Sequence, residues 1–274
     1  MKTESAQTGS PASTRIGPEH ADLDEVFRLK YGDPATTGWS PRMRYERGYF
    51  TPEDHYEALV STLVTESTTW LDVGCGRCLF PGNEALARKL SGRCSHLTGV
   101  DPDATILENP YVHEKAQETI DAYRADRGFD LVTLRMVAEH LTDPDAAVAS
   151  LQRLVVPGGR VVVYTVYKWS PIPLLTRITP FGLHHPIKRL VWGTEEKDTF
   201  PVANRMNTRG DLREVFGRHG FREAWFRYAD DCRTFAGWRA TQWIELACWR
   251  VLRAVGLHYP EVCLLGVYER RSDS

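Results

Sequence analysis

Long hydrophobic runs are absent from this 274-residue chain. No apolar stretch approaches the roughly 20 residues that a helix needs to cross a bilayer. The first residues carry Lys2 and Glu4 among serines and threonines, without the apolar core of a secretory signal. We therefore expect a protein without a transmembrane segment that works in the cytoplasm.

A strong charge of either sign is also missing. The 34 basic and 36 acidic residues leave a formal net charge of −2, so the chain has no global electrostatic footprint for duplex nucleic acid. Hydrophobic residues make up 42% of the sequence, which is ordinary for a globular protein with a sizeable core. The length fits one elaborated domain or two small ones.

Cysteine is sparse and scattered, with six residues in the whole chain. Cys75 and Cys78 form one C-x-x-C pair inside a glycine-containing loop, and no second pair follows at a spacing typical of zinc sites. We expect reduced, packed cysteines and no metal.

What the chain does have is an informative loop, Trp70-Leu-Asp-Val-Gly-Cys-Gly-Arg-Cys78. An apolar run ends there at two glycines, a helix-like segment follows over 82–90, and a second apolar run ends at Asp101 and Pro102. This is the layout of a nucleoside-binding β-α-β unit. Glycines let the backbone approach the ligand, and the second strand's carboxylate accepts hydrogen bonds from ribose hydroxyls.

Spacing distinguishes between nucleoside cofactors. A dinucleotide fingerprint would need glycine where this chain has Leu79, which argues against a nicotinamide oxidoreductase. Asp72 stands two residues before the first glycine, and this arrangement resembles motif I of class I S-adenosylmethionine-dependent methyltransferases. Phe129–Leu141 resembles the fourth-strand motif of that family, and 156–164 resembles its proline-glycine turn and fifth strand.

The alternation of strand-like and helix-like segments by itself indicates a parallel, doubly wound sheet. The resemblance, which covers roughly residues 68–166, further implies a Rossmann-like α/β fold. Its mostly parallel, seven-stranded sheet would have an antiparallel last strand and would carry helical and loop cover insertions. The implied cofactor is S-adenosyl-L-methionine, with S-adenosyl-L-homocysteine as product.

The resemblance also implies the cofactor-binding residues. They come from the first loop, the ribose acid, the turn after strand three and the floor after strand four: Asp72, Gly74, Cys75, Gly76, Asp101, Pro102, Ala116, Gln117, Arg135 and Met136. Tyr49, an aromatic of the N-terminal segment, is a further candidate, since a sulfonium cation is attracted to an aromatic face. Arg135 has two open roles, contact with a substrate anion or a structural salt bridge. Lys115 stands where family members often have an acid near the adenine.

Three histidines are candidate general bases, since an unperturbed imidazole titrates near neutrality. His140 follows strand four and begins a helix in our prediction; it is either a base or a packed residue near the cofactor. His184 and His185 lie in a proline-rich segment. Adjacent side chains of an extended segment point to opposite sides, so at most one of these two faces a cleft.

Along the chain we expect a mobile tail over 1–20, then a single methyltransferase domain over 21–274. That domain would include an N-terminal helical cover over 21–66 and two insertions over 168–207 and 229–260 that cover the carboxyl ends of the strands. Expected strands are 69–73, 96–100, 112–117, 129–134, 160–166, 221–228 and 262–268. Expected helices are 21–30, one starting at Thr51, 144–154 and 211–219, with a loop over 31–41.

The leading hypothesis is methyl transfer to a small, partly apolar metabolite, at oxygen. Methylation of a protein, an RNA or a membrane-associated acceptor, and a non-catalytic binding partner that keeps the fold, remain the alternatives. The sequence does not indicate an oligomeric state.

Overall fold

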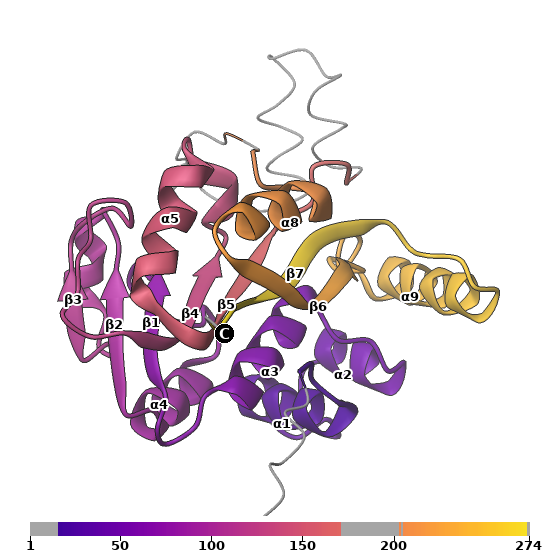
Figure 1. The fold of residues 1–274 in the computed structure, drawn as a ribbon. Helices are drawn as coiled ribbons and strands as arrows, with labels where there is room; N and C mark the ends of the chain where they lie inside the picture. Colours follow the sequence, from indigo (N-terminus) through magenta and orange to yellow (C-terminus); the bar gives the residue numbers. More distant parts are fainter. Residues whose placement is uncertain (1–15, 171–202, 204, 273–274) are drawn as a thin grey trace, which may run out of the picture.

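The computed structural model describes residues 16–170, 203 and 205–272. Its centre is a seven-stranded sheet of order β3-β2-β1-β4-β5-β7-β6 (Figure 1). All neighbouring strands are parallel except β7, which runs antiparallel to both β5 and β6. The strands are β1 Thr69–Val73, β2 His96–Val100, β3 Glu114–Ala116, β4 Phe129–Arg135, β5 Val155–Val166, β6 Phe221–Asp230 and β7 Glu261–Arg270. The predicted fold class is confirmed.

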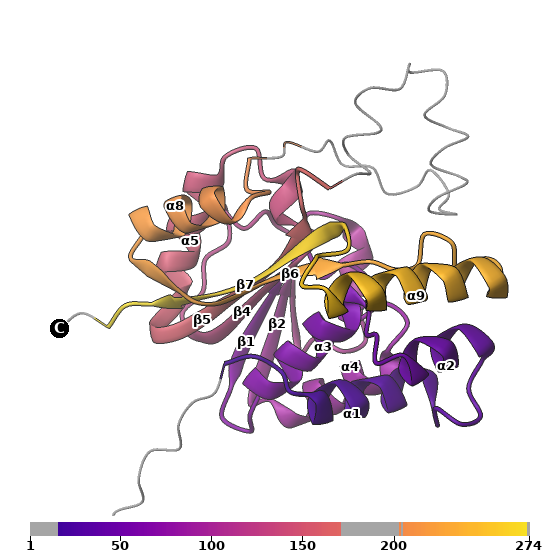
Figure 2. The same ribbon diagram turned by 90° about the vertical axis from the view of Figure 1, so that its right-hand side faces the viewer.

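Helices cover both faces of the sheet (Figure 2). They are α1 His20–Tyr31, α2 Trp39–Glu46, α3 Pro52–Leu63, α4 Glu84–Arg93, α5 Pro144–Leu154, α8 Arg209–Arg218 and α9 Arg239–Ala254. One buried cluster joins α1, α3 and α4 to the sheet, and a second joins α5 and α8 to its other face. Two short 3-10 turns, η1 Ala104–Glu108 and η2 Ala138–His140, follow β2 and β4.

The apolar run of β5 shows why both faces must be covered. Val161 and Val163 belong to the cluster under α5 and α8, whereas Val162 and Tyr164 belong to the cluster under α1, α3 and α4. Successive side chains of a strand point to opposite faces, so a continuous apolar run is stable only between two layers of helices.

Local signals fix the start of α3 as the sequence predicts. The Thr51 hydroxyl accepts a hydrogen bond from the Asp54 amide at 3.2 Å, and the Asp54 carboxylate accepts one from the Thr51 amide at 2.9 Å. Pro52 occupies the first helical position, where a missing N–H costs nothing. This reciprocal cap satisfies two backbone donors of the first turn.

Three predictions differ from the structure in ways that have a local cause. The expected loop over 31–41 ends early because α2 begins at Trp39, with Pro41 in a first turn that needs no amide partner. β5 begins at Val155 rather than at 160, since Val155 pairs with Phe129 across a register irregularity. His140 ends a single 3-10 turn instead of starting an α-helix.

The carboxyl ends of β1, β2 and β4 meet at one edge of the sheet, and the predicted cofactor residues follow those ends. Segment 229–260 contributes the end of β6 and then α9, which contacts α2. Most of the other predicted insertion, 171–202, lies outside the described residues.

Candidate active site

Asp72, one residue before the end of β1, is a buried carboxylate that accepts a hydrogen bond from the neighbouring strand. In the parallel register it lies opposite Thr133, whose hydroxyl donates to Asp72 Oδ1 at 2.5 Å. The Trp70 indole N–H donates in turn to the Thr133 oxygen at 2.8 Å. Burial raises the pKa of Asp72 to about 7, against the opposing influence of the Thr133 hydrogen bond and of Arg135. A cationic ligand at this carboxylate would therefore be stabilising.

The glycines that follow adopt backbone conformations that are rare for residues with a side chain. Gly74 has φ 70° and donates its amide to the Val100 carbonyl at 2.7 Å. A Cβ on Gly74 would lie 2.2 Å from Val137 Cγ2, so the loop passes directly against the segment after β4. Gly76 has φ 45°, and its amide donates to Asp101 Oδ2 at 2.8 Å.

Asp101 joins this loop to the end of β2. Its other oxygen, Oδ1, accepts from the Asp103 amide at 2.8 Å. Each carboxylate oxygen accepts up to two hydrogen bonds, which leaves capacity on both for ribose hydroxyls. Asn109, whose role the sequence reasoning missed, is fully buried and donates to the Gly76 carbonyl at 3.1 Å. This hydrogen bond joins the end of η1 to the same loop.

The turn after β3, where the sequence predicts the adenine contacts, lies beside Asp101. The Ala116 carbonyl accepts from the Asp101 amide at 3.1 Å, and the Gln117 amide side chain reaches the Pro102 carbonyl at 3.5 Å. Ala116, Gln117 and Pro102 therefore lie beside the ribose acid. Lys115, which departs from the family pattern, donates to the Leu107 carbonyl at 2.8 Å.

The two cysteines of the loop are neutral thiols. Cys75 packs so closely that a Cβ on Gly99 would lie 2.6 Å from its sulfur, and burial strongly raises its pKa. Burial also raises the pKa of Cys78. Within the described part of the chain, no three His, Cys, Asp or Glu side chains are grouped as metal ligands.

Beyond β4 the backbone takes an unusual turn. Met136 has φ 53°, a left-handed conformation that is rare for a residue with a side chain, and its amide donates to the Tyr164 carbonyl at 2.8 Å. Such strained positions cluster at functional sites. Met136 packs against the cluster that contains Cys75, which places both residues on the same side of the sheet.

Arg135 lines a cavity of about 180 Å³ between α1, α3 and the end of β4. The other lining residues combine charged and aromatic groups: Lys30, Tyr31, Glu53, Tyr56, Glu57, Pro81 and Arg233. The charge of Arg135 also lowers the pKa of Asp72, and the two residues lie near the carboxyl ends of the paired strands β4 and β1. Tyr31 and Tyr56 were not among the predicted site residues, because the sequence placed Tyr31 at the start of a loop and Tyr56 on the buried face of a helix.

Of the three predicted catalytic histidines, His140 lies in the described part of the chain. His140 is half-buried, and its amide donates to the Val137 carbonyl at 2.9 Å, so it lies on the same turn that meets Gly74. Neighbouring Glu139 accepts from the Thr165 hydroxyl at 2.7 Å, and burial raises its pKa. His184 and His185 lie outside the described residues.

Tyr49 has a different position from the one the resemblance implied. Its hydroxyl donates to the Asp230 carbonyl at 2.9 Å and accepts from the Cys232 amide at 2.8 Å, and its ring packs edge-on against Trp249. This cluster is separate from the one that holds Cys75. Tyr49 therefore joins the N-terminal segment to the end of β6, and we no longer assign it to the cofactor.

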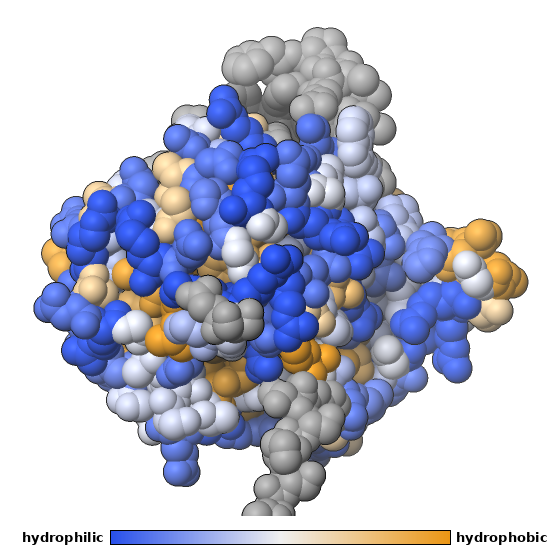
Figure 3. Space-filling model, in the orientation of Figure 1, coloured by the Kyte–Doolittle hydropathy of each residue, from blue (hydrophilic) through white to orange (hydrophobic). Residues whose placement is uncertain are grey.

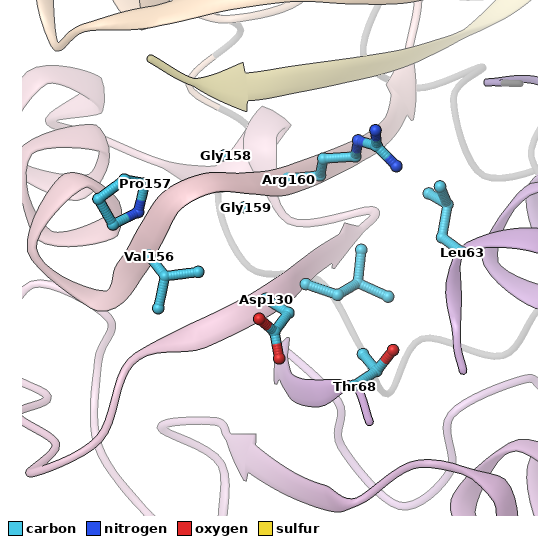
Figure 4. A pocket seen from close by; sticks show the side chains of 9 residues that line it. Leu63, Thr68, Asp130, Val156, Pro157, Gly158, Gly159 and Arg160 are labelled. Atoms are coloured by element: carbon cyan, nitrogen blue, oxygen red, sulfur yellow. The ribbon is translucent and has the colours of Figure 1, made fainter. Parts of the chain in front are cut away.

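A larger cavity of about 280 Å³ lies at the opposite edge of the sheet (Figure 4). It is lined by residues at the amino ends of β1 and β4 and by the start of β5, among them Thr68, Asp130 and 156–160. The Asp130 carboxylate is already occupied by the Thr69 amide and hydroxyl at 2.8 and 2.7 Å. Ligands of doubly wound sheets bind at the carboxyl ends, so this cavity is not part of the nucleoside site.

Comparison with known proteins agrees with this geometry. A family model described as a methyltransferase domain matches residues 45–223. The chain belongs to the class I S-adenosylmethionine-dependent methyltransferases. The cofactor that this family membership implies is S-adenosylmethionine.

Sequence relatives of this methyltransferase cover only part of it. An uncharacterised methyltransferase of Mycobacterium bovis is 34% identical over 119 residues, 40% of this chain and 57% of the relative. A ubiquinone biosynthesis O-methyltransferase of Alkalilimnicola ehrlichii is 34% identical over 140 residues, 47% of this chain and 53% of the relative. One from Coxiella burnetii with the same name is 23% identical over 192 residues, 67% of this chain and 78% of the relative.

Solved structures share the fold. A mycolic acid cyclopropane synthase solved with S-adenosylhomocysteine is 17% identical and has a TM-score of 0.50, covering 92% of this chain and 99% of that one. A methyltransferase from Methanosarcina mazei is 15% identical with a TM-score of 0.50, covering 78% and 97%. Among the described residues, no helix of the methyltransferase is both long and apolar enough to cross a bilayer.

The residues at the carboxyl edge fit the cofactor. Gly74 leaves no room for a side chain, Asp101 has free acceptor capacity, and Asp72 is a desolvated carboxylate suited to an ammonium group. When bound, the cofactor supplies a methyl group already activated by a sulfonium.

Proposed function

We propose that this enzyme methylates a small, partly apolar metabolite at an oxygen atom, and that the acceptor enters the cavity beside Arg135. The observation that carries the proposal is the position of Arg135 between two sites. It lines the 180 Å³ cavity and also acts electrostatically on Asp72 in the cofactor loop. A methyl acceptor must lie ~3 Å from the donor carbon and in line with the bond that breaks.

The charges around the cavity support an anionic or developing anionic oxygen. Lys30 is paired with Glu57 at 2.8 Å, and Arg233 is paired with Glu53 at 2.9 Å. Arg135 forms no ion pair with any residue in the described part of the chain. An arginine that forms no ion pair among the described residues is suited to an acceptor's carboxylate or phenolate oxygen.

The remaining surfaces of the cavity are aromatic or apolar. Tyr31, Tyr56 and Pro81 contribute them, and the Tyr56 ring stacks on Tyr164 with centroids 5.2 Å apart. A pocket that combines a few polar groups with aromatic walls favours a small molecule over a polymer. The volume of about 180 Å³ agrees with an acceptor of modest size.

The reaction balances without another reactant. The acceptor oxygen forms a bond to the methyl carbon as the carbon–sulfur bond breaks, and the bonding pair leaves with sulfur. A hydroxyl acceptor must also give its proton to a base, for which His140, His184 and His185 stay the candidates. An acceptor that arrives as a carboxylate or phenolate needs no base. The names of two relatives, both O-methyltransferases, support oxygen as the acceptor atom.

The test is transfer of labelled methyl from S-adenosylmethionine into cell extracts fractionated by size, followed by mass spectrometry of the labelled product. We expect label in a small metabolite, released from an ester or ether oxygen. An Arg135→Gln variant should lose most transfer while its S-adenosylhomocysteine affinity stays within about tenfold of wild type.

Two outcomes would contradict the proposal. Label found in protein or RNA fractions would make the acceptor a macromolecule. Tight binding of S-adenosylhomocysteine without transfer to any fraction would support the non-catalytic alternative. Asp101→Ala serves as the matched control, since it should reduce cofactor binding and transfer together.

A further inference from the structure

Helix α9 exposes one apolar face and buries another face that mixes polar and apolar side chains. Ile244, Val251 and Val255 are 61%, 62% and 64% exposed, and their spacing puts them along one face of the helix and its end. On the buried face lie Gln242 and Glu245, which are 0% and 4% exposed, together with Leu246 and Trp249. An ordinary surface helix has polar side chains on its solvent face, so the exposed apolar row is unusual.

Large apolar side chains extend this face beyond both ends of the helix. Phe235 and Trp238 precede α9 and are 57% and 76% exposed, and Leu257 follows it at 57%. Figures 1 and 2 show α9 projecting from the body of the protein beside α2. Figure 3 shows a hydrophobic surface at its outer end, with hydrophilic residues beside it. We call Phe235, Trp238, Ile244, Val251, Val255 and Leu257 the α9 face.

The charges beside this face have one sign. Between residues 235 and 257 the exposed charged side chains are all arginines, Arg239, Arg250 and Arg253. The one acid of the segment, Glu245, is buried and accepts from the Thr234 amide at 3.2 Å and the Tyr259 hydroxyl at 2.9 Å. The neighbouring surface is therefore complementary to an anionic partner.

A further cation and two ring contacts extend the pattern. Arg47 of the α2 end lies 4.9 Å from the ring centroid of Trp243, itself 51% exposed. Arg253 lies at the same distance over Trp249. Long arginine side chains can lie along apolar surface while their charged ends reach outward, and tryptophan favours boundaries that are apolar on one side and wet on the other.

We propose that the α9 face docks on the surface of an anionic lipid bilayer. Exposed apolar and tryptophan side chains would enter the boundary between headgroups and acyl chains, and the arginines would contact lipid phosphates. A second copy of the chain fits less well, because a symmetric contact would bring arginines of the same sign together. The helix would lie on the membrane and would not cross it.

The helix is held in place for this role from its other side. The Trp249 indole donates to the Asp230 carboxylate at 2.6 Å, and Tyr49 packs edge-on against the same ring. Glu245 binds the backbone of the preceding loop. Since α9 is already ordered, binding does not require folding of the helix, which removes part of the entropic cost.

The experiment is flotation of the full chain with vesicles of phosphatidylcholine alone or of phosphatidylcholine with phosphatidylglycerol. We expect wild type to bind the anionic vesicles at least about tenfold more tightly, and to release from them as salt is raised. The double variant Ile244→Glu, Val251→Glu should lose this binding about tenfold or more. Arg239→Gln with Arg250→Gln should weaken it and flatten its salt dependence.

Leu107→Glu is the matched control, because Leu107 is 59% exposed on η1, outside the α9 face. It should bind vesicles like wild type. Unchanged S-adenosylhomocysteine affinity and melting temperature in every variant would show that the fold and the cofactor site are intact. The readout does not depend on the acceptor, so it can fail while the proposed reaction stands.

Other results would overturn the proposal. One is equal binding of the Glu variants and wild type, or no binding of wild type to anionic vesicles. A wild-type dimer that the Glu variants dissociate, in sedimentation without vesicle binding, would show that a second copy covers the α9 face. Vesicle binding that arises only after 171–202 is replaced by a short linker would show that this chain covers its own face.

Discussion

The Thr133 hydroxyl donates to Asp72 Oδ1 at 2.5 Å, between two parallel strands that carry the central residues of the site. It is one of the few polar interactions that compensate a carboxylate whose pKa burial raises to about 7. The ordinary value of an aspartate is near 4. The folded protein therefore binds a proton at Asp72 that the unfolded chain releases.

This gives a prediction for Asp72→Asn. A carboxyl whose folded pKa is raised makes folding less favourable as pH rises from about 4 to about 7, and the penalty is constant above that range. Three pKa units correspond to about 4 kcal/mol as an upper limit. We expect the variant to exceed wild type in free energy of unfolding at pH 8 and to approach it near pH 4, as urea titrations at both pH values would measure.

The same variant should bind the cofactor less well. An ammonium group favours the ionised carboxylate, so wild-type affinity should rise with pH through about 7, whereas the affinity of Asp72→Asn should stay flat there. Calorimetry with S-adenosylhomocysteine across this range measures both. Parallel pH profiles for the two proteins would contradict our assignment of Asp72 to the ligand's amino group.

Alanine substitutions at two glycines distinguish the cost of a strained backbone from the cost of a steric clash. Gly74 and Gly82 have φ of 70° and 78°, but a Cβ on Gly74 meets Val137 at 2.2 Å while one on Gly82 meets nothing within 4 Å. Gly82→Ala should cost only the conformational penalty of about 1–2 kcal/mol. Gly74→Ala should cost more and should also abolish cofactor binding. Thermal melts and ligand titration of both variants give the comparison; equal losses would mean that the contact with Val137 relaxes freely.

Asp101 and Asp103 form a second matched pair. Asp101→Ala should weaken S-adenosylhomocysteine binding by ~1–3 kcal/mol, the cost of unmade charge-assisted hydrogen bonds to ribose. Asp103 instead caps η1 through the Thr105 amide at 2.8 Å, so Asp103→Ala should leave affinity nearly unchanged. Isothermal titration of both proteins distinguishes them. A folded Asp101→Ala variant with wild-type affinity would remove that residue from the site.

The Lys30–Glu57 ion pair gives a prediction about the free energy of unfolding. Both side chains are buried, and the acids Glu57 and Asp54 raise the pKa of Lys30 although burial opposes this. Lys30→Met would leave the Glu57 carboxylate without its cation and should cost about 3–5 kcal/mol. Adding Glu57→Gln should restore much of that loss. If the double variant were no more stable than Lys30→Met alone in urea unfolding, the pair would not be coupled.

Local chemistry made much of the fold predictable. The bounds of β1, β2 and α5 agree with the expected 69–73, 96–100 and 144–154. A glycine follows β1, an Asp–Pro pair follows β2, and an Asp–Pro pair begins α5. Thr133 was also within reach of sequence reasoning, since alignment of two parallel strands places it opposite Asp72. Which site residues act in binding and catalysis stays a prediction.

Other features depend on contacts that sequence spacing does not encode. The composition of 229–260 does not indicate which side chains of α9 lie inward, and the buried face holds Gln242 and Glu245 beside Leu246 and Trp249. The sequence predicts Tyr49 as a cofactor contact, whereas in the structure its hydroxyl bonds to the backbone of Asp230 and Cys232. Tyr31 lines the 180 Å³ cavity because α1 packs on α3.

The hydrogen bonds of the Tyr49 hydroxyl also affect when the N-terminal helices can finish packing during translation. It is bound by backbone groups 181 and 183 residues further along the sequence. At ribosomal speeds of 5–20 residues per second, those partners follow Tyr49 by on the order of 10 to 40 s. The N-terminal helices must therefore wait for the last quarter of the protein before their packing is complete, and a truncated nascent chain would present them to chaperones.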